Sequence, residues 1–224
     1  MWPNISVEVA DRIQAARAYF TAIAGLPFAP PASPPLIPHA ETAAKGLMFV
    51  QLYAIYEFTV CGVVRAAWQE INRRGATLSS IRLEMLGVAL DAELTAALEC
   101  GVGRTWEKRM ALFRRVSSTD NATFRDDLFP ADGSHYRVKQ LQTIWDLLGI
   151  PGHPLPRMPL IGLIDLELVE HRNAIAHGRK TAEEVGRSYS ISDIHQKIDH
   201  TQDVCMHIIA TTQTHCSNPA NLLR

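Results

Sequence analysis

The stretch LIGLIDLELVEHRNAIAHGRKTAEEVGR, residues 160–187, decides what the fold of this chain can be. No proline occurs between Leu160 and His177, and leucine, isoleucine, alanine and glutamate, which are usable helix formers, dominate. Gly178 follows at once, and glycine ends helices readily because it adopts the left-handed conformation without steric cost. The stretch therefore predicts one helix over residues 160–177 that stops at Gly178.

The predicted helix is apolar on two flanks. At ~100° per residue, one stripe contains Ile161, Ile164, Leu168 and Ile175. A second flank contains Leu163, Leu166, Val169 and Ala176. Only a narrow face is left for solvent, with Glu167, Glu170 and Ala174. A helix with two apolar flanks is usually packed between neighbours, which favours a helical bundle.

Arg172 and His177 are the residues of this helix that bear chemistry. Arg172 falls in the apolar stripe, and a buried guanidinium needs a partner. His177 is five positions on, about 7.5 Å along the axis and roughly 140° around it, so the two side chains can flank one concave spot. Asn173 has i,i+4 spacing to His177 and is a candidate to orient the imidazole.

Two interpretations of these residues remain open from spacing alone. In the structural one, His177 only satisfies free carbonyls at the helix end, and Arg172 forms a buried ion pair with Glu57 of an earlier helix. In the functional one, the pair binds a phosphate. Glu57 then supports the site by orienting Arg172 and partly neutralising its charge. The other interpretation of Glu57 is a carboxylate at the edge of the core, hydrogen-bonded to a nearby tyrosine.

The string Arg172-Asn-Ala-Ile-Ala-His177 resembles the R-x4-6-H motif of the HEPN superfamily, in which Asn is a favoured residue after the arginine. The wider string LVEHRNAIAHG resembles the RiboL-PSP-HEPN group and related small stand-alone HEPN-like nucleases. Residues 45–60, KGLMFVQLYAIYEFTV, resemble the early helix of these proteins, with a Tyr53-x3-Glu57 pattern. Together the matches cover about residues 40–209. Some HEPN toxins carry a modified tyrosine two positions after the histidine, where this chain has Arg179, so that control is not expected.

The resemblance implies a fold, an activity and a site. It implies a compact helical bundle, commonly a homodimer, and a metal-independent endoribonuclease from a toxin–antitoxin or phage-defence system, with RNA as substrate, an antitoxin protein as partner and no cofactor. His177 would transfer protons, Arg172 would stabilise the phosphate, and Asn173 would support them. Arg179 and Lys180 would contact the RNA backbone. Two copies facing each other would supply two histidines for attack by the 2′-OH.

Composition limits the other classes of function. The net charge is −1, so the chain has no global basic field for nucleic acid, and RNA contacts must be local. Its 4 cysteines form no CxxC pair, and no signal peptide is recognisable, which predicts a cytoplasmic protein. The apolar run 46–64 is interrupted by Gln51 and Glu57 and predicts a core helix rather than a membrane span.

The whole pattern predicts a single all-α domain over residues 1–224, a HEPN-like bundle of about five to seven helices. It divides into an N-terminal helix at 6–25, a proline-rich connector at 26–40 and a bundle core at 41–216. Within the core, helices are expected at 41–73, 77–99 with a break near Gly87, 104–116, 135–148, 160–177 and 191–214. We expect loops at 149–159 and 181–190 and a frayed tail from residue 217.

Two regions outside the motif also contain residues of a kind that binds ligands. The helix 104–116 is basic, and it is either a solvated face or a track for RNA; its cations are Arg104, Lys108, Arg109, Arg114 and Arg115. The histidines of the last helix lack metal-ligand spacing, so no metal is predicted. The alternative to a nuclease is a non-catalytic HEPN module for binding or assembly. A third interpretation is that the chain is an antitoxin-like protein that sequesters another protein.

Overall fold

The computed structural model describes residues 2–24, 36–128 and 135–223. Over this part the chain is all-α, as predicted: helices carry the architecture, and the only β-type pairing is two isolated bridges, Thr77 with Asn121 and Ile81 with Leu223. The buried apolar side chains form one connected core cluster.

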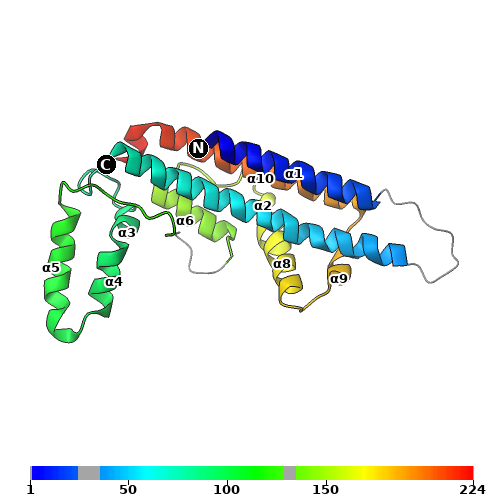
Figure 1. The fold of residues 1–224 in the computed structure, drawn as a ribbon, viewed down its shortest axis with the longest axis horizontal. Helices are drawn as coiled ribbons and strands as arrows, with labels where there is room; N and C mark the ends of the chain where they lie inside the picture. The colour runs from blue at the N-terminus through cyan, green and yellow to red at the C-terminus, as the bar shows by residue number, and fades with distance from the viewer. Residues whose placement is uncertain (1, 25–35, 129–134, 224) are drawn as a thin grey trace.

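Three long helices lie side by side and form the main layer of the molecule: α1 (Trp2–Ala24), α2 (Leu36–Arg74) and α10 (Ile191–Ser217) (Figure 1). Helix α1 begins earlier than the predicted residue 6. The reason is that Ile5 extends the buried stripe of Val9 and Ile13 by one turn, while Pro3 lies in the first turn, where proline is tolerated.

Helix α2 is the central helix, since it packs against α1, α8, α9 and α10. It begins at Leu36, so the prediction of a connector up to residue 40 was wrong over 36–40, where Pro38 lies in the first turn of the helix. Residues 25–35 of that connector lie outside the described residues. By length and composition α2 is able to cross a membrane, but 56% of its most apolar window is buried against other helices.

The predicted helix over 77–99 was wrong in its first half. Residues 75–85 form turns, followed by α3 (Leu86–Ala89) and α4 (Asp91–Glu99), which are separated at Leu90, close to the break predicted near Gly87. Leu78, Ile81 and Met85 are buried at helical spacing, which is why the pattern suggested a helix. The backbone N–H groups of Leu78 and Ser79 instead donate to the carbonyls of residues 120 and 118.

Helix α4 and helix α5 (Thr105–Val116), joined through the 3₁₀ turn η1 (Val102–Arg104), form a hairpin that projects from the main layer (Figure 1). Helix α5 confirms the predicted helix at 104–116. Neither α4 nor α5 contains a fully buried residue.

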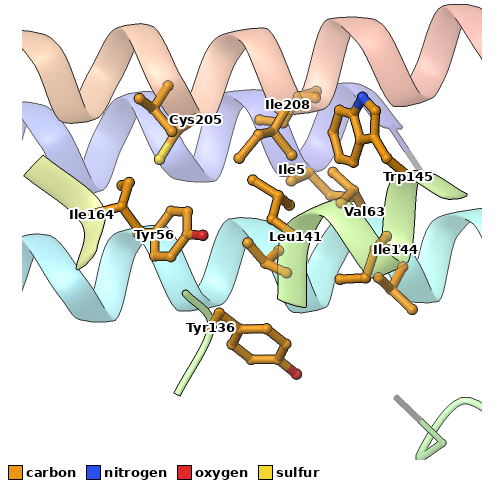
Figure 2. Close-up of a cluster of buried hydrophobic side chains, with 14 of the residues drawn as sticks. Ile5, Tyr56, Val63, Tyr136, Leu141, Ile144, Trp145, Ile164, Cys205 and Ile208 are labelled. Atoms are coloured by element: carbon orange, nitrogen blue, oxygen red, sulfur yellow. The ribbon is translucent and has the colours of Figure 1, made fainter. Parts of the chain in front are cut away.

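Helix α6 (Val138–Leu148) starts three residues later than predicted but has the expected core stripe. Every apolar position of that stripe is buried: Val138, Leu141, Ile144, Trp145 and Leu148. Figure 2 shows α6 side chains gathered with Val63 of α2 and Ile208 of α10. Gly149, at φ +69°, ends the helix.

The helix that carries the motif has the predicted extent but not the predicted interior. It consists of α7 (Leu160–Gly162), a π-helical turn η2 (Leu163–Leu168) and α8 (Val169–Ala176). A π turn contains an extra residue, so positions beyond it are rotated relative to a regular α-helical wheel. The predicted faces were therefore partly wrong: Leu166 is 67% exposed, while Ala174 is buried.

Helix α9 (Ala182–Gly186) lies in the stretch predicted to be a loop. A capping box between Thr181 and Glu184 starts it. It packs closely on α2, because a Cβ added to Gly46 would overlap the Ala182 carbonyl, and one added to Gly186 would overlap the Thr42 carbonyl.

The C-terminal region is more ordered than predicted. Helix α10 is capped by Ser190 with Asp193 as its capping-box partner, and it runs to Ser217. The 3₁₀ turn η3 (Pro219–Leu222) follows, and Leu222 is buried. The predicted fraying of residues 217–224 was wrong for the described part, because the Leu222 carbonyl accepts a hydrogen bond from the Arg82 N–H.

Candidate functional site

Arg172, on α8, is half-buried and is held by two neighbours. Its Nη1 donates to Oδ1 of Asn173 at 3.1 Å. Its Cζ lies 5.4 Å from the ring centroid of Tyr53, a cation–π distance. The ring and the amide hold the guanidinium in place while the residue stays partly exposed, which is the state a phosphate-binding arginine needs.

Glu57 is close to this arrangement but is not the direct partner predicted for Arg172. Among the described residues the two form no ion pair; instead the Tyr53 hydroxyl donates to Oε1 of Glu57 at 3.4 Å. Tyr53 and Glu57 are one turn apart on α2, so the arginine meets the ring face and the carboxylate meets the hydroxyl. The predicted ion pair is thus replaced by an indirect connection through tyrosine.

His177 lies at the C-cap of α8, where its side chain is exposed. The backbone N–H of His177 donates to the Asn173 carbonyl at 3.1 Å. Gly178, at φ +67°, ends the helix as predicted. Asn173 is 7% exposed, and within the described part of the chain its side chain is hydrogen-bonded to Arg172. Asn173 therefore orients the arginine in this structure, not the imidazole as predicted.

Arg179 and Lys180 follow directly and are both exposed. Their backbone N–H groups donate to the Ala174 carbonyl at 2.8 and 3.1 Å, which closes the helix end. In the described part of the chain neither side chain has an ion-pair partner, so both cations are free to meet an anion beside His177.

His135 belongs to the same site, and sequence reasoning missed it. Its ring is edge-on to Tyr53, with centroids 5.9 Å apart, and its Nδ1 is 3.5 Å from the Tyr53 hydroxyl. Partial burial lowers the pKa of His135, and the charge of Arg172 is the next cause. No local pattern marks this histidine, because only the fold brings residue 135 to the motif.

The segment that carries His135 is fixed to the motif helix. The Tyr136 N–H donates to the Tyr53 hydroxyl at 3.4 Å, and the Val138 N–H donates to Oδ1 of Asp165 in the π turn at 2.9 Å. Arg137 donates to the Asp165 carbonyl at 3.0 Å and forms an ion pair with Glu170. The start of α6 is thus tied to both η2 and α8.

Tyr53 is the residue shared by these contacts. It is buried on α2, and burial together with the Glu57 charge raises its pKa to about 12. The hydroxyl therefore stays protonated at neutral pH and acts as a hydrogen-bonding group. It connects α2, α8 and the segment before α6 at one point.

The α4–α5 hairpin presents a second surface, a set of exposed apolar side chains on elements that also carry cations. Three of them form a row along α5 at three- or four-residue spacing, Trp106, Met110 and Phe113, and Leu98 of α4 and Val102 of η1 are exposed as well. Trp106 is 73% exposed, and the Arg109 guanidinium lies 5.2 Å from its ring centroid. Arg104, Lys108 and Arg114 have no ion-pair partner in the described residues.

Two cavities lie away from the motif. One of 530 Å³ is lined by the end of α2 and by Leu222 and Leu223, and one of 410 Å³ lies between residues 150–151 and α10. Neither is lined by a residue of the motif. Within the described residues, no group of three histidine, cysteine or acidic side chains could hold a metal ion.

Comparison with known proteins gives one match. A family model described as HEPN_MAE_28990-like HEPN matches residues 4–219, which include both motif residues and all of the main layer except residues 2 and 3. No curated protein and no solved structure matches the chain.

Proposed function

We propose, from the premise that the chain belongs to the HEPN_MAE_28990-like HEPN family, that it is a metal-independent endoribonuclease built around Arg172 and His177. The observation that carries the proposal is the pairing of a half-buried arginine, held on the Tyr53 ring, with an exposed histidine at the same helix end. HEPN membership by itself supports only an RNA-related role.

The chemistry follows from RNA itself. The 2′-OH attacks the adjacent phosphorus, the P–O5′ bond breaks, and the products are a cyclic phosphate and a free 5′-OH. Arginine holds phosphate oxygens through two parallel hydrogen bonds and stabilises the charge that develops on them. His177 transfers a proton, the role that histidine most often has in acid–base catalysis. Arg179 and Lys180, exposed beside it, bind the neighbouring backbone.

The reaction needs two proton transfers, one from the 2′-OH and one to the leaving oxygen. His177 provides one of them, and a second group must provide the other. The chain is proposed to form a homodimer through the exposed face of its motif helix, as HEPN-like proteins commonly do. The second histidine then comes either from the other copy or from the same chain.

The α4–α5 hairpin is proposed as a contact for single-stranded RNA. Exposed aromatic rings flanked by arginines bind single strands by stacking on bases and pairing with phosphates, and stacking contributes about 1–3 kcal/mol per base. Trp106 with Arg109, and Phe113 on the same row, have this arrangement. The hairpin and α8 project from the same side of the main layer (Figure 1), so one RNA could contact both.

The cellular setting is proposed from the family resemblance alone. The protein would be a cytoplasmic toxin or phage-defence effector, with cellular or phage RNA as substrate and an antitoxin protein as its inhibitor.

A non-catalytic binding module is the second candidate, and one observation favours it. Arg172 contacts both Asn173 and Tyr53, so it has a packing role that needs no catalysis. Arg172→Lys separates the two functions. Lysine keeps the charge but loses the bidentate geometry, so a nuclease should lose cleavage by about 10²–10³-fold, whereas a binding module should keep its RNA affinity and show no cleavage in either form.

A further inference from the structure

We infer that His135 supplies the second proton transfer from within the same chain: its Nε2 takes the proton from the 2′-OH while His177 gives a proton to the leaving O5′. The inference rests on the proposed ribonuclease function and deepens it. It assigns the base to a residue outside the motif, and it removes the need for a second copy's histidine in the reaction.

The position of His135 is fixed by its neighbours. Tyr136, the next residue, is buried and hydrogen-bonded to Tyr53 through its N–H, and its hydroxyl accepts from Cys61 at 3.5 Å. Arg137 and Val138 are bonded to Asp165 of the π turn. Three consecutive residues after His135 are therefore anchored to α2 and to the motif helix. This rigidity is what a base must have to act at a defined distance.

The hydrogen bonds around Tyr53 assign the tautomer of His135. A tyrosine hydroxyl has one proton, and the Glu57 carboxylate can only accept it. With that proton directed to Glu57, the contact at 3.5 Å requires Nδ1 of His135 to be the donor. In a neutral imidazole with a protonated Nδ1, Nε2 carries the free lone pair. Among the residues that the structure describes, that nitrogen makes no hydrogen bond, so it is available to accept a proton from substrate.

The charges around His135 favour its neutral, basic form. Arg172 on α8 lowers its pKa after burial, and Arg137 and His177 lower it further; Glu57 on α2 opposes them by raising it. The net direction is downward, so the imidazole stays unprotonated to a lower pH than an ordinary histidine. A general base must be unprotonated when substrate binds.

Arg172 is a neighbour of both histidines: it shares the end of α8 with His177, and its charge acts on His135. It shares the Tyr53 ring with His135, at 5.4 and 5.9 Å from the ring centroid respectively, and it shares α8 with His177. A phosphate held by the guanidinium is therefore flanked by one histidine from α8 and one from the segment before α6. In-line displacement needs such a base and acid on opposite sides of the phosphorus. After one turnover His135 holds the proton and His177 has lost one, and exchange with water restores both.

The first test is the pH dependence of cleavage. His135→Gln keeps a polar side chain of similar size beside Tyr53 but cannot act as a base at neutral pH, and His135→Ala removes the side chain. We expect both to lower cleavage by about 10²–10⁴-fold with unchanged helicity and melting temperature. We also expect the fall in wild-type rate at low pH to disappear in them. His200→Ala, a histidine of α10 outside the site, should behave as wild type. A variant with wild-type rate and pH profile overturns the inference.

The second test is subunit mixing. An excess of inactive His177→Ala chain is added to wild type, and cleavage is measured per wild-type chain. If each chain holds its own base and acid, activity per wild-type chain is unchanged. If the site needs His177 from two copies, mixed dimers are dead and activity falls toward zero, which overturns the inference but leaves the nuclease intact. A folded wild type that cleaves no RNA overturns the nuclease itself, and the inference with it.

Discussion

The Arg172 guanidinium lies over the ring of Tyr53, with its Cζ 5.4 Å from the ring centroid. One residue belongs to the central helix α2 and the other to the motif helix α8. The tyrosine hydroxyl on the far edge of the same ring meets Glu57 and His135. The ring thus separates a cation from a carboxylate that would otherwise pair with it, and this leaves the arginine able to bind an external anion.

Tyr53→Phe and Tyr53→Leu should differ in a defined way. Phenylalanine keeps the ring under Arg172 but leaves the buried Tyr136 N–H without its acceptor, a loss of about 1–3 kcal/mol of unfolding free energy. Leucine also removes the cation–π contact, worth about 0.5–1 kcal/mol or more. Denaturant unfolding measures the stability of the two variants, and an RNA cleavage assay measures their activity. Equal cleavage by the two variants would contradict a role for the ring in holding Arg172.

Gly186→Ala should destabilise the packing of α9 on α2. A methyl group there would overlap the Thr42 carbonyl, and a backbone atom cannot move aside cheaply. Overpacking of this kind costs about 1–3 kcal/mol or more. Gly87→Ala is the matched control, because nothing lies within 4 Å of its added Cβ and alanine favours α3. Melting curves of both variants make the comparison, and a Gly186 variant as stable as the Gly87 variant would contradict the close contact.

The extent of the motif helix was predictable because propensity and a glycine stop act locally. Its faces were not, because a helical wheel assumes a uniform turn and the π turn at Leu163–Leu168 breaks that assumption. Helix α9 escaped prediction for a different reason: it is five residues long, and close contact with α2 at two glycines helps to hold it.

Some residues of the candidate site were likewise predictable from the sequence, and others were not. Arg172, Asn173 and His177 lie within one helix end, so their spacing was visible in the sequence. The indirect link from Glu57 through Tyr53, and the presence of His135, depend on how α2 and the start of α6 meet α8. Contacts between distant elements leave no periodic signal in a single sequence.

Leu166→Glu should weaken self-association. Leu166 is 67% exposed on the motif helix, and a large apolar side chain on that face suits the centre of a two-fold contact. A buried carboxylate facing its own copy would oppose dimer formation. Sedimentation of wild type and variant over a concentration series should show a dimer for wild type and a shift toward monomer for the variant. A wild type that is monomeric at all concentrations would contradict the proposed homodimer.

Trp106→Ala should weaken RNA binding without lowering stability. The side chain is 73% exposed and supports Arg109, so its loss removes a stacking surface worth about 1–3 kcal/mol of binding, or roughly 5–150-fold in affinity. Leu98→Ala is the control, because it is also apolar and exposed on the hairpin but cannot stack. Titration of a labelled single-stranded RNA measures both. Equal affinity of the two variants would argue for a protein or membrane contact instead.

The most direct test of the nuclease is cleavage of a structured RNA by purified protein in excess chelator, beside His177→Ala. The account predicts that wild type cuts without metal, that the products carry cyclic phosphate and 5′-OH ends, and that the variant leaves the RNA intact while remaining folded. Cleavage of the RNA by the His177→Ala protein at the wild-type rate, or a folded wild type that binds RNA and never cuts it, would contradict the account.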